Sequence, residues 1–321
     1  MSELKELQKD IVFDSGKLET LIATPFSVID LEKREYKDRK NLWCKFLPAL
    51  ENNRENIENK THRSSTYDFD RKFKHVSVFN PFICEIVYKW FSAKDCKILD
   101  PFAGGAVRGF VASYLDRQYA GCDINKNQIV DNNNYISMLD NNKYKPVYYN
   151  CSSADFTSNE HFDLLFTCPP YFNIEKYNGG EKDLSMLPTY EVFLEQYDKC
   201  FSNCCKYMKN DTFACIVVSN FRGKNGFYHD FVGDTIKIMQ KNNYFFYNDM
   251  ILKTPVGSAC IMANNYLKKN RKVAKIHQNL LVFYKGDIKN IHFDDISEKD
   301  LLSLPKERFD NAQNVSVFDF L

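Results

Sequence analysis

The sequence contains no apolar run of about 18 residues, the length that a bilayer-spanning helix requires. It also lacks any Cys-x-x-Cys pair, and its 11 cysteines are scattered among apparent strands and helices without a matching group of histidines. A metal site and a disulfide framework are therefore not expected. The polar start from Met1 to Lys5 does not resemble a signal peptide, so we expect a soluble, cytoplasmic protein with no membrane partner.

Charge of neither sign is in excess, because 43 basic and 42 acidic residues give a net charge of +1. This balance argues neither for nor against a nucleic-acid partner. The distribution is uneven, since residues 287–321 carry eight acids and four bases, which leaves +5 for the rest of the chain (+1 minus −4). A local basic patch is therefore compatible with the nearly neutral total.

Two consecutive prolines end a strongly apolar segment. Residues 162–167 are typical of a strand buried on both faces, and Cys168, Pro169, Pro170 and Tyr171 follow directly. Neither proline has a backbone N–H, so the strand stops there. In an open parallel sheet, ligands bind at the carboxyl ends of the strands. Taken alone, the segment indicates no more than a turn with a tyrosine packed in the core.

A glycine turn follows another strand candidate. Residues 97–100 end in Asp100, and the stretch from Pro101 to Gly105 leads into a helix. Glycines let the backbone approach a ligand, and the helix N-terminus lies behind them. The next strand candidate ends in Asp123, whose carboxylate can accept both hydroxyls of a ribose. A dinucleotide-binding fold is the natural alternative for such a pattern.

These residues resemble those of a known family. The run Asp100-Pro101-Phe102-x-Gly104-Gly105 is similar to the loop with which amino-methyltransferases bind S-adenosylmethionine (SAM), and Cys168–Tyr171 resembles their (Asp/Asn/Ser)-Pro-Pro-(Tyr/Phe/Trp) motif. The resemblance covers about residues 76–286. It implies a SAM-dependent DNA amino-methyltransferase with an α/β, Rossmann-like, seven-stranded class I methyltransferase fold, SAM as cofactor and DNA as partner. Seven strand candidates that alternate mostly with helices agree with this fold.

The resemblance also implies which residues hold SAM. Asp100 would face the methionine ammonium, and Asp123 would bind the ribose. Many relatives place an acid after the third strand for the adenine amine; here Cys151 or Ser152 occupies that position, and Asp155 follows a few residues later. The implied cofactor residues are Phe79, Asn80, Pro81, Asp100, Pro101, Phe102, Ala103, Gly104, Gly105, Asp123, Ile124, Ser152 and Asp155.

Cys168 departs from the family pattern, which has Asp, Asn or Ser at this position. A thiol accepts hydrogen bonds weakly, so the target amine would depend more on the Pro169 carbonyl. The resemblance implies that Cys168, Pro169 and Pro170 orient this amine and that Tyr171 stacks on a base rotated out of the duplex. An alternative makes Cys168 a nucleophile, as in cytosine carbon-5 methyltransferases, although those enzymes carry Pro-Cys.

Further residues are candidates for nucleic-acid contacts. The polar stretch 173–188 is expected to be a loop near the target base, in which Tyr177 is a candidate for stacking, and Phe172 directly before the loop is a further candidate contact. Arg222 follows the fifth strand. A loop between the last two strands carries several basic residues and no acidic one. This composition suits phosphate contacts but also a solvated hairpin loop. The bases proposed for this role are Lys268, Lys269, Arg271 and Lys272.

We expect an N-terminal appendage over 1–70, which is a possible target-recognition region, a catalytic domain over 71–286 and an acidic tail over 287–321. The predicted function is site-specific DNA methylation at N6 of adenine or N4 of cytosine, as in restriction-modification. An RNA methyltransferase of the same fold is one alternative. A SAM- and DNA-binding module without catalysis is another, because of Cys168. The target base, the target sequence and the oligomeric state stay open.

Overall fold

The computed structural model describes residues 23, 25–47, 58–59, 78–176, 180–256 and 259–291. The chain divides into two units, and the larger one, Phe26–Ile291, contains all the helices and strands described below. Most of the predicted N-terminal appendage and residues 292–321 of the predicted tail lie outside the described residues. Among the helices that are described, none has both the length and the hydrophobicity needed to cross a bilayer.

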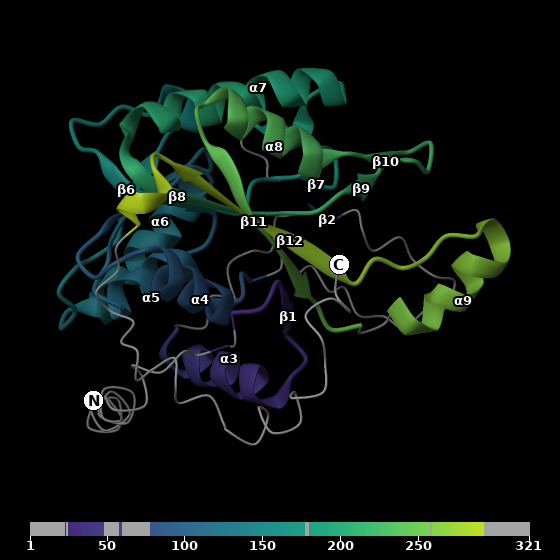
Figure 1. Ribbon diagram of the computed structural model, residues 1–321, viewed down its shortest axis with the longest axis horizontal. Helices are drawn as coiled ribbons and strands as arrows, with labels where there is room; N and C mark the ends of the chain where they lie inside the picture. The colour runs from purple at the N-terminus through teal and green to yellow at the C-terminus, as the bar shows by residue number, and fades with distance from the viewer. Residues whose placement is uncertain are drawn as a thin grey trace. The chain divides into compact units, whose positions relative to one another are not determined.

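An eight-stranded sheet runs through the larger unit (Figure 1). Its strands are β1 (Val28–Asp30), β3 (Lys97–Asp100), β4 (Gln118–Asp123), β5 (Val147–Asn150), β6 (Phe162–Thr167), β8 (Met208–Val218), β11 (Phe245–Lys253) and β12 (His277–Lys285). Across the sheet they lie in the order β1-β11-β12-β8-β6-β3-β4-β5. Strand β12 is antiparallel to both of its neighbours, and the other pairs are parallel.

The sheet confirms the predicted Rossmann-like α/β fold. All seven predicted strands are present, and numbered in chain order they lie as 3-2-1-4-5-7-6. The eighth strand, β1, comes from the N-terminal region and was not predicted. It forms the edge of the sheet and pairs in parallel with β11, with Val28 opposite Ile251. The order reverses between β3 and β6, and in open sheets this switch point is where ligands bind.

Helices cover both faces of the sheet. The described helices are α3 (Arg34–Phe46), α4 (Pro81–Phe91), α5 (Val107–Tyr114), α6 (Lys126–Asn134), α7 (Tyr190–Cys204), α8 (Phe231–Lys241) and α9 (Ala259–Asn270). In Figure 1, α7 and α8 lie above the sheet, and α3, α4 and α5 lie below it. The short strands are β2 (Glu58–Asn59), which pairs with β7 (Glu175–Lys176), and β9 (Phe221–Arg222), which pairs with β10 (Tyr228–His229).

Local sequence signals explain where the helices next to the sheet begin. The side chain of Asn80 accepts a hydrogen bond from the backbone N–H of Phe82 at 3.0 Å, and Pro81 occupies the first turn of α4, where no donor is required. Thr189 caps α7 in the same way, with its hydroxyl oxygen 3.3 Å from the backbone nitrogen of Val192. These caps define the residue at which each helix begins.

Aromatic side chains anchor α7 to the sheet. Phe193, Tyr197 and Phe201 are fully buried and belong to the same core cluster as Leu165 of β6 and Ile216 of β8. Each large apolar side chain buried in this way contributes roughly 1.5–3 kcal/mol. This packing holds β6 and β8 in place, and the carboxyl end of β6 forms part of the site described below.

The segment between β11 and β12 differs from its prediction as a loop, because it contains helix α9. Alanine, methionine, leucine and lysine are good helix formers, and the run Ala259–Asn270 is rich in them. The sequence interpretation considered only the positive charges of this segment. In Figure 1, α9 lies to the side of the sheet and covers neither face.

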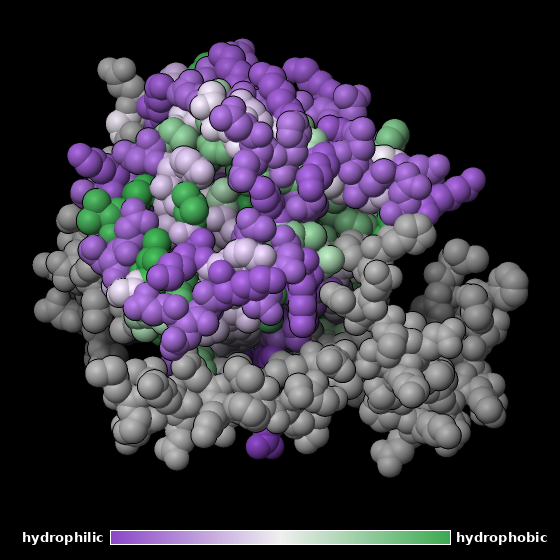
Figure 2. Space-filling view, turned by 90° about the vertical axis from the view of Figure 1, so that its left-hand side faces the viewer, coloured by the Kyte–Doolittle hydropathy of each residue, from purple (hydrophilic) through white to green (hydrophobic). Residues whose placement is uncertain are grey.

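Figure 2 shows the left-hand side of the molecule in Figure 1, toward which β12 ends. Side chains that are mostly hydrophilic cover this face, with a small group of hydrophobic residues among them. Because β12 is antiparallel to its neighbours, the parallel strands begin here and end at the opposite edge. The ends of the parallel strands therefore form a separate surface, on which the site lies.

Candidate functional site

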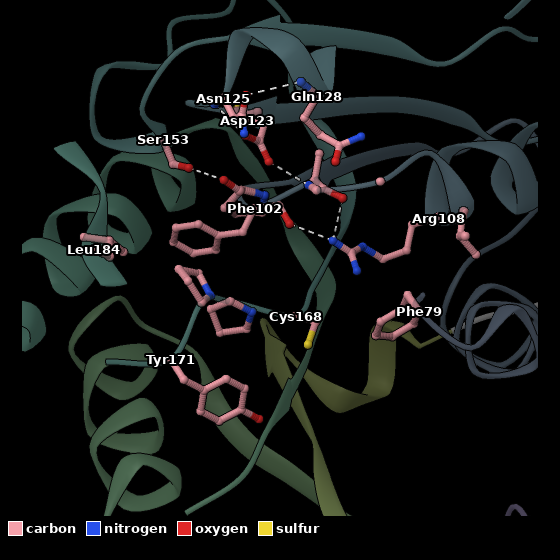
Figure 3. A pocket seen from close by; sticks show the side chains of 18 of the residues that line it. Phe79, Phe102, Arg108, Asp123, Asn125, Gln128, Ser153, Cys168, Tyr171 and Leu184 are labelled. Carbon is pink, nitrogen blue, oxygen red and sulfur yellow. Dashed lines mark hydrogen bonds between the residues drawn. The ribbon is translucent and has the colours of Figure 1, made fainter. Parts of the chain in front are cut away.

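A cavity of about 470 Å³ lies at the carboxyl ends of β3, β4, β5 and β6, which is the edge where the strand order reverses. Its volume is within the range of small-molecule sites. Figure 3 shows Asp123 and Asn125 toward one end of the cavity and Tyr171 toward the other. The predicted residues that line it are Phe79, Asn80, Pro101, Phe102, Ala103, Gly104, Gly105, Asp123, Ile124, Ser152, Cys168, Pro169, Pro170 and Tyr171.

The glycine loop and the Cys-Pro-Pro-Tyr turn meet because their strands are neighbours. Strands β3 and β6 are parallel, with Leu99 opposite Leu165, so both end at the same edge. The hydroxyl of Thr167, the last residue of β6, donates a hydrogen bond to the Asp100 carboxylate at 2.6 Å. One buried contact therefore connects the first residue of the glycine-loop motif with the residue that precedes the Cys-Pro-Pro-Tyr turn.

Asp100 lies behind the cavity and is fully buried. Its carboxylate also accepts hydrogen bonds from Arg108 Nε at 2.5 Å, from the Tyr119 hydroxyl at 2.7 Å and from the backbone N–H of Phe102 at 3.1 Å. A direct contact between Asp100 and the amino group of a ligand does not agree with this burial. Its side chain instead holds the loop and Arg108.

Arg108 ties the loop to the protein. Its Nη2 donates hydrogen bonds to the carbonyl oxygens of Phe102 at 2.6 Å and Ala103 at 2.9 Å, and its guanidinium lies 4.8 Å from the centre of the Phe79 ring. Burial lowers the pKa of Arg108, but the Asp100 carboxylate more than offsets this, so the pKa lies well above its ordinary value. The guanidinium is therefore a permanent charge at the cavity wall.

Asp123 receives two backbone hydrogen bonds that orient its carboxylate. One comes from the N–H of Gly104 at 2.9 Å and the other from the N–H of Asn125 at 2.7 Å. Gly104 has φ +53°, a left-handed conformation that favours glycine. The loop also requires Gly121 of β4, because a Cβ there would lie 2.7 Å from the Cβ of Ala103. The loop thus packs closely on β4.

Aromatic rings surround the turn after β6. The Tyr171 ring lies edge-on to Phe221 and Phe231, with centroid distances of 5.7 and 5.6 Å, and its hydroxyl lies 3.5 Å from Nε2 of Gln278. Phe172 points away from the cavity into the core beside α7, where its ring is 5.8 Å from that of Phe193. Phe172 therefore supports the turn from behind.

Other predicted residues lie outside the cavity. Pro81 is buried in α4, and Asp155 forms an exposed ion pair with Lys182 at 2.6 Å. Tyr177 is not among the described residues. The basic residues proposed for nucleic-acid contacts lie outside the cavity on the same side of the fold. Arg222 is on β9, Lys268 and Lys269 are in the last turn of α9, and Arg271 and Lys272 follow that helix.

The sequence interpretation missed several cavity residues. Arg108 had a detectable signal, since it is a lone charge in an apolar helix directly after the glycine loop. Leu31 and Lys40 had none, because they reach the cavity through the pairing of β1 with β11. Cys122 and Cys151 also line the cavity, and the hydrogen bond between them together with burial raises the pKa of Cys122, which keeps this thiol neutral.

Within the described residues, no group of three or more His, Cys, Asp or Glu side chains is placed to hold a metal ion. Cys200, Cys204 and Cys205 are buried in the core with α7. Burial is the main cause that raises the pKa of each of these thiols. The thiols of this cluster are thus neutral core groups.

Comparisons with known proteins give one family match. Residues 162–317 match the DNA methylase family. None of the curated proteins matches the chain.

Several solved methyltransferase structures are similar to the chain at low identity. A methyltransferase from Pyrococcus furiosus has 16% identity and a TM-score of 0.42, over 65% of this chain and 84% of that chain. Magnesium protoporphyrin IX methyltransferase from Synechocystis PCC 6803, with bound SAM, has 10% identity and a TM-score of 0.42, over 64% and 79%. TrmN from Thermus thermophilus has 9% identity and a TM-score of 0.41, over 64% and 49%.

Proposed function

We propose that this chain transfers the methyl group of SAM to an exocyclic amine of a base in DNA, and the match of residues 162–317 to the DNA methylase family supports this proposal. The amine is N6 of adenine or N4 of cytosine. The observation that carries the proposal is that the glycine loop and the Cys-Pro-Pro-Tyr turn line one cavity, at the point where the strand order reverses. A methyl donor and its acceptor have to meet within a few ångströms, and this arrangement supports such a meeting.

The residues of the cavity fit the nucleoside part of SAM. The Asp123 carboxylate is oriented by two backbone N–H groups and suits the ribose hydroxyls. A Cβ at Gly104 would meet no protein atom within 4 Å, so the loop borders open space on this side. Phe102, Ile124 and Leu184 supply apolar surface for a purine ring.

A basic side chain in the cavity wall suits the amino-acid part of SAM. Lys40 of α3 is exposed and lines the cavity, and its ammonium suits the methionine carboxylate. Asp100 acts one step further away, as a positioning residue that holds Arg108 and through it the carbonyl groups of the loop. This role replaces the direct contact that the sequence predicted for Asp100.

At the other end of the cavity the chain orients the base. SAM supplies a methyl group that its sulfonium makes electrophilic, so the protein has to hold the amine in line with it and accept hydrogen bonds from the amine N–H groups. Cys168 and the carbonyl group of Pro169 are the acceptors, and the two prolines keep the turn stiff. Tyr171 stacks on the extruded base, with Phe221 and Phe231 as support behind its ring.

Mass spectrometry of nucleosides tests this function. DNA and RNA are incubated separately with the protein and SAM and then digested. N6-methyladenosine or N4-methylcytidine in the deoxy form, from DNA only, is the expected product, and its identity decides between the two bases. Methylation of RNA alone would contradict the assignment. Binding of SAM without any methylated base would favour a SAM- and DNA-binding module without catalysis, which is the alternative that Cys168 suggests.

A further inference from the structure

Strands β9 and β10 form a hairpin, residues 221–229, next to the cavity. The strands are antiparallel, with Arg222 opposite Tyr228. Backbone hydrogen bonds close the turn, from Gly223 N–H to the Phe227 carbonyl at 2.8 Å and from Gly226 N–H to the Gly223 carbonyl at 2.9 Å. The side chain of Asn225 accepts a further hydrogen bond from the N–H of Phe227 at 3.0 Å. The tip of the hairpin is therefore held in one conformation.

The base of the hairpin packs on the residue that we propose stacks on the target base. Phe221 is buried, and its ring contacts Tyr171 at a centroid distance of 5.7 Å and His229 at 5.2 Å. His229 in turn lies 4.2 Å from the ring of Tyr190 on α7. Figure 1 shows the hairpin extending outward from this point, on the same side as α9. The tip is thus rigidly placed relative to Tyr171.

Phe227 at the tip is 75% exposed, the largest fraction among the large hydrophobic side chains that the structure describes. The surroundings of Phe227 are basic. Residues 220–229 contain Arg222 and Lys224 but no acid, and the ammonium group of Lys272 lies 3.1 Å from where a Cβ on Gly226 would be. A protruding aromatic ring between positive charges matches a duplex, whose stacked bases lie between two rows of phosphates.

We propose that Phe227 is a wedge that enters the base stack of duplex DNA where the target base has left it. The proposal rests on the proposed function, because a base has to leave the duplex before its amine reaches the cavity. Apolar side chains that insert between base steps are a general means of opening a duplex. Stacking of the ring on the remaining bases offsets part of the cost of unstacking. Arg222, Lys224 and Lys272 contact the flanking phosphates.

Variants of Phe227 test the wedge on native and on heat-denatured DNA from the same source. We expect Phe227→Ala to lower kcat/KM on the duplex at least tenfold and to change it much less on denatured DNA. Phe227→Trp should restore most of the activity on the duplex, because it again supplies a ring that stacks. SAM affinity and the thermal unfolding midpoint should equal those of the wild type, since the Phe227 side chain is exposed.

A matched control is Phe245→Ala. Phe245 is 69% exposed, but it begins β11 and pairs with Tyr284, at the edge of the sheet opposite the cavity. This variant should act like the wild type on both substrates. The wedge is refuted if Phe227→Ala methylates duplex DNA within twofold of the wild type, or if Trp restores nothing. A wild-type protein that methylates neither form of DNA refutes the proposed function itself, and the wedge with it.

Discussion

In the proposed reaction, Cys168 determines how strongly this chain holds the target amine. It follows Thr167, which is bonded to Asp100, so its position at the end of β6 is fixed from behind. The family pattern places an oxygen acceptor here, and sulfur is the weaker acceptor of the two. The Pro169 carbonyl then carries more of the interaction. We therefore propose that the thiol acts by position and hydrogen bonding, without a covalent bond to the base.

Substitution of Cys168 separates an acceptor from a nucleophile. We expect Cys168→Ser to keep or increase kcat for DNA methylation, because serine is similar in shape and a better acceptor. Cys168→Ala should lower kcat about fivefold to tenfold, since one hydrogen bond contributes about 1 kcal/mol. Single-turnover assays with both variants measure this. Loss of all activity in Cys168→Ser would contradict the acceptor role and support a nucleophile.

Single residues also show what the sequence could and could not reveal. Asp123 was predicted as a ribose acceptor, and it lines the cavity with a carboxylate fixed by two backbone groups. Asp100 was predicted to face the ligand, yet it is buried behind the loop. Both acids end a strand, so periodicity cannot distinguish them. The difference between the two acids comes from Arg108. It lies eight residues after Asp100 and binds the Asp100 carboxylate only in the folded chain.

Among the elements, helix α3 is the least expected part of the site. It is held on α4 by Glu85, a fully buried residue whose carboxylate accepts hydrogen bonds from Arg39 at 2.5 and 2.8 Å and from Trp43 Nε1 at 2.6 Å. Lys89 adds an ion pair at 3.2 Å. Burial raises the pKa of Glu85, but the hydrogen bond from Arg39 and the charges of Lys89 and Arg39 outweigh this, so the pKa is lowered.

Removal of this charge should loosen α3. We expect Glu85→Gln to lower the free energy of unfolding at pH 7 by about 3 kcal/mol, because it leaves two partly buried cations, Arg39 and Lys89, without their anionic partner. A lowered pKa stabilises the fold above the ordinary value of Glu, about 4.3, and this contribution is lost as the pH falls through the folded-state pKa. The difference between variant and wild type should therefore shrink in acid.

Urea unfolding at a series of pH values measures this effect. The control is Glu160→Gln, whose carboxylate is paired with Lys97 on the surface and should contribute little at any pH. An equal loss of stability in both variants, or a Glu85→Gln effect that does not depend on pH, would contradict the role given to Glu85.

Helix α3 also places Lys40 at the cavity. Lys40→Ala should weaken SAM binding about threefold, the effect expected for an exposed ion pair. Lys37→Ala is the matched control, because Lys37 is exposed on the same helix but does not line the cavity. Calorimetric titration with SAM compares them. Equal affinities for the two variants would remove Lys40 from the binding site.

The elements near the cavity were more predictable than those at the edge of the fold. Strands β3, β4 and β6 were predicted from apolar runs that end at Asp100, at Asp123 and at two prolines. The prediction was correct because each run is buried on both faces and each end has a clear stop signal. Strand β1 is three residues long, and only its pairing with β11 makes it a strand. Helix α9 was not predicted, because a segment with several lysines is equally compatible with a solvated loop.

For the whole molecule, charge is placed where the proposed DNA would lie. Helix α9 follows the carboxyl end of β11 and precedes the start of the antiparallel β12, so it lies at the same edge as the cavity. Its last turn carries Lys268 and Lys269, and both are exposed. The nearly neutral net charge of the chain therefore conceals a basic side next to the site.

The salt dependence of DNA binding tests this surface. Replacement of Lys268 and Lys269 by alanine should weaken binding to all duplexes alike and reduce the slope of log K against log salt by about 0.9 for each phosphate that the protein no longer neutralises. The control replaces Lys143 and Lys145, which are exposed and precede β5 at the opposite edge. Fluorescence anisotropy over a range of salt measures both. Equal slopes for the two double variants would contradict a DNA surface at α9.

The meeting of the two motifs depends on the topology of the whole sheet. The sequence placed each motif at the end of a strand, and the prediction of one cavity required that those strands be neighbours. The structure makes β3 and β6 adjacent and parallel, which is a long-range pairing that no local pattern encodes. The wall supplied by Leu31 and Lys40 depends on a still longer connection, from β1 to β11, and was not predictable from the sequence.

The most direct test of the central claim, that this cavity binds the methyl donor, is calorimetric titration of SAM into the wild type and Asp123→Ala. The account predicts one site per chain in the wild type and an affinity at least about tenfold lower in the variant, because a charged acceptor is lost. The control Asp140→Ala, in which only a surface ion pair is removed, should bind as the wild type does. Unchanged SAM affinity in Asp123→Ala would contradict the account.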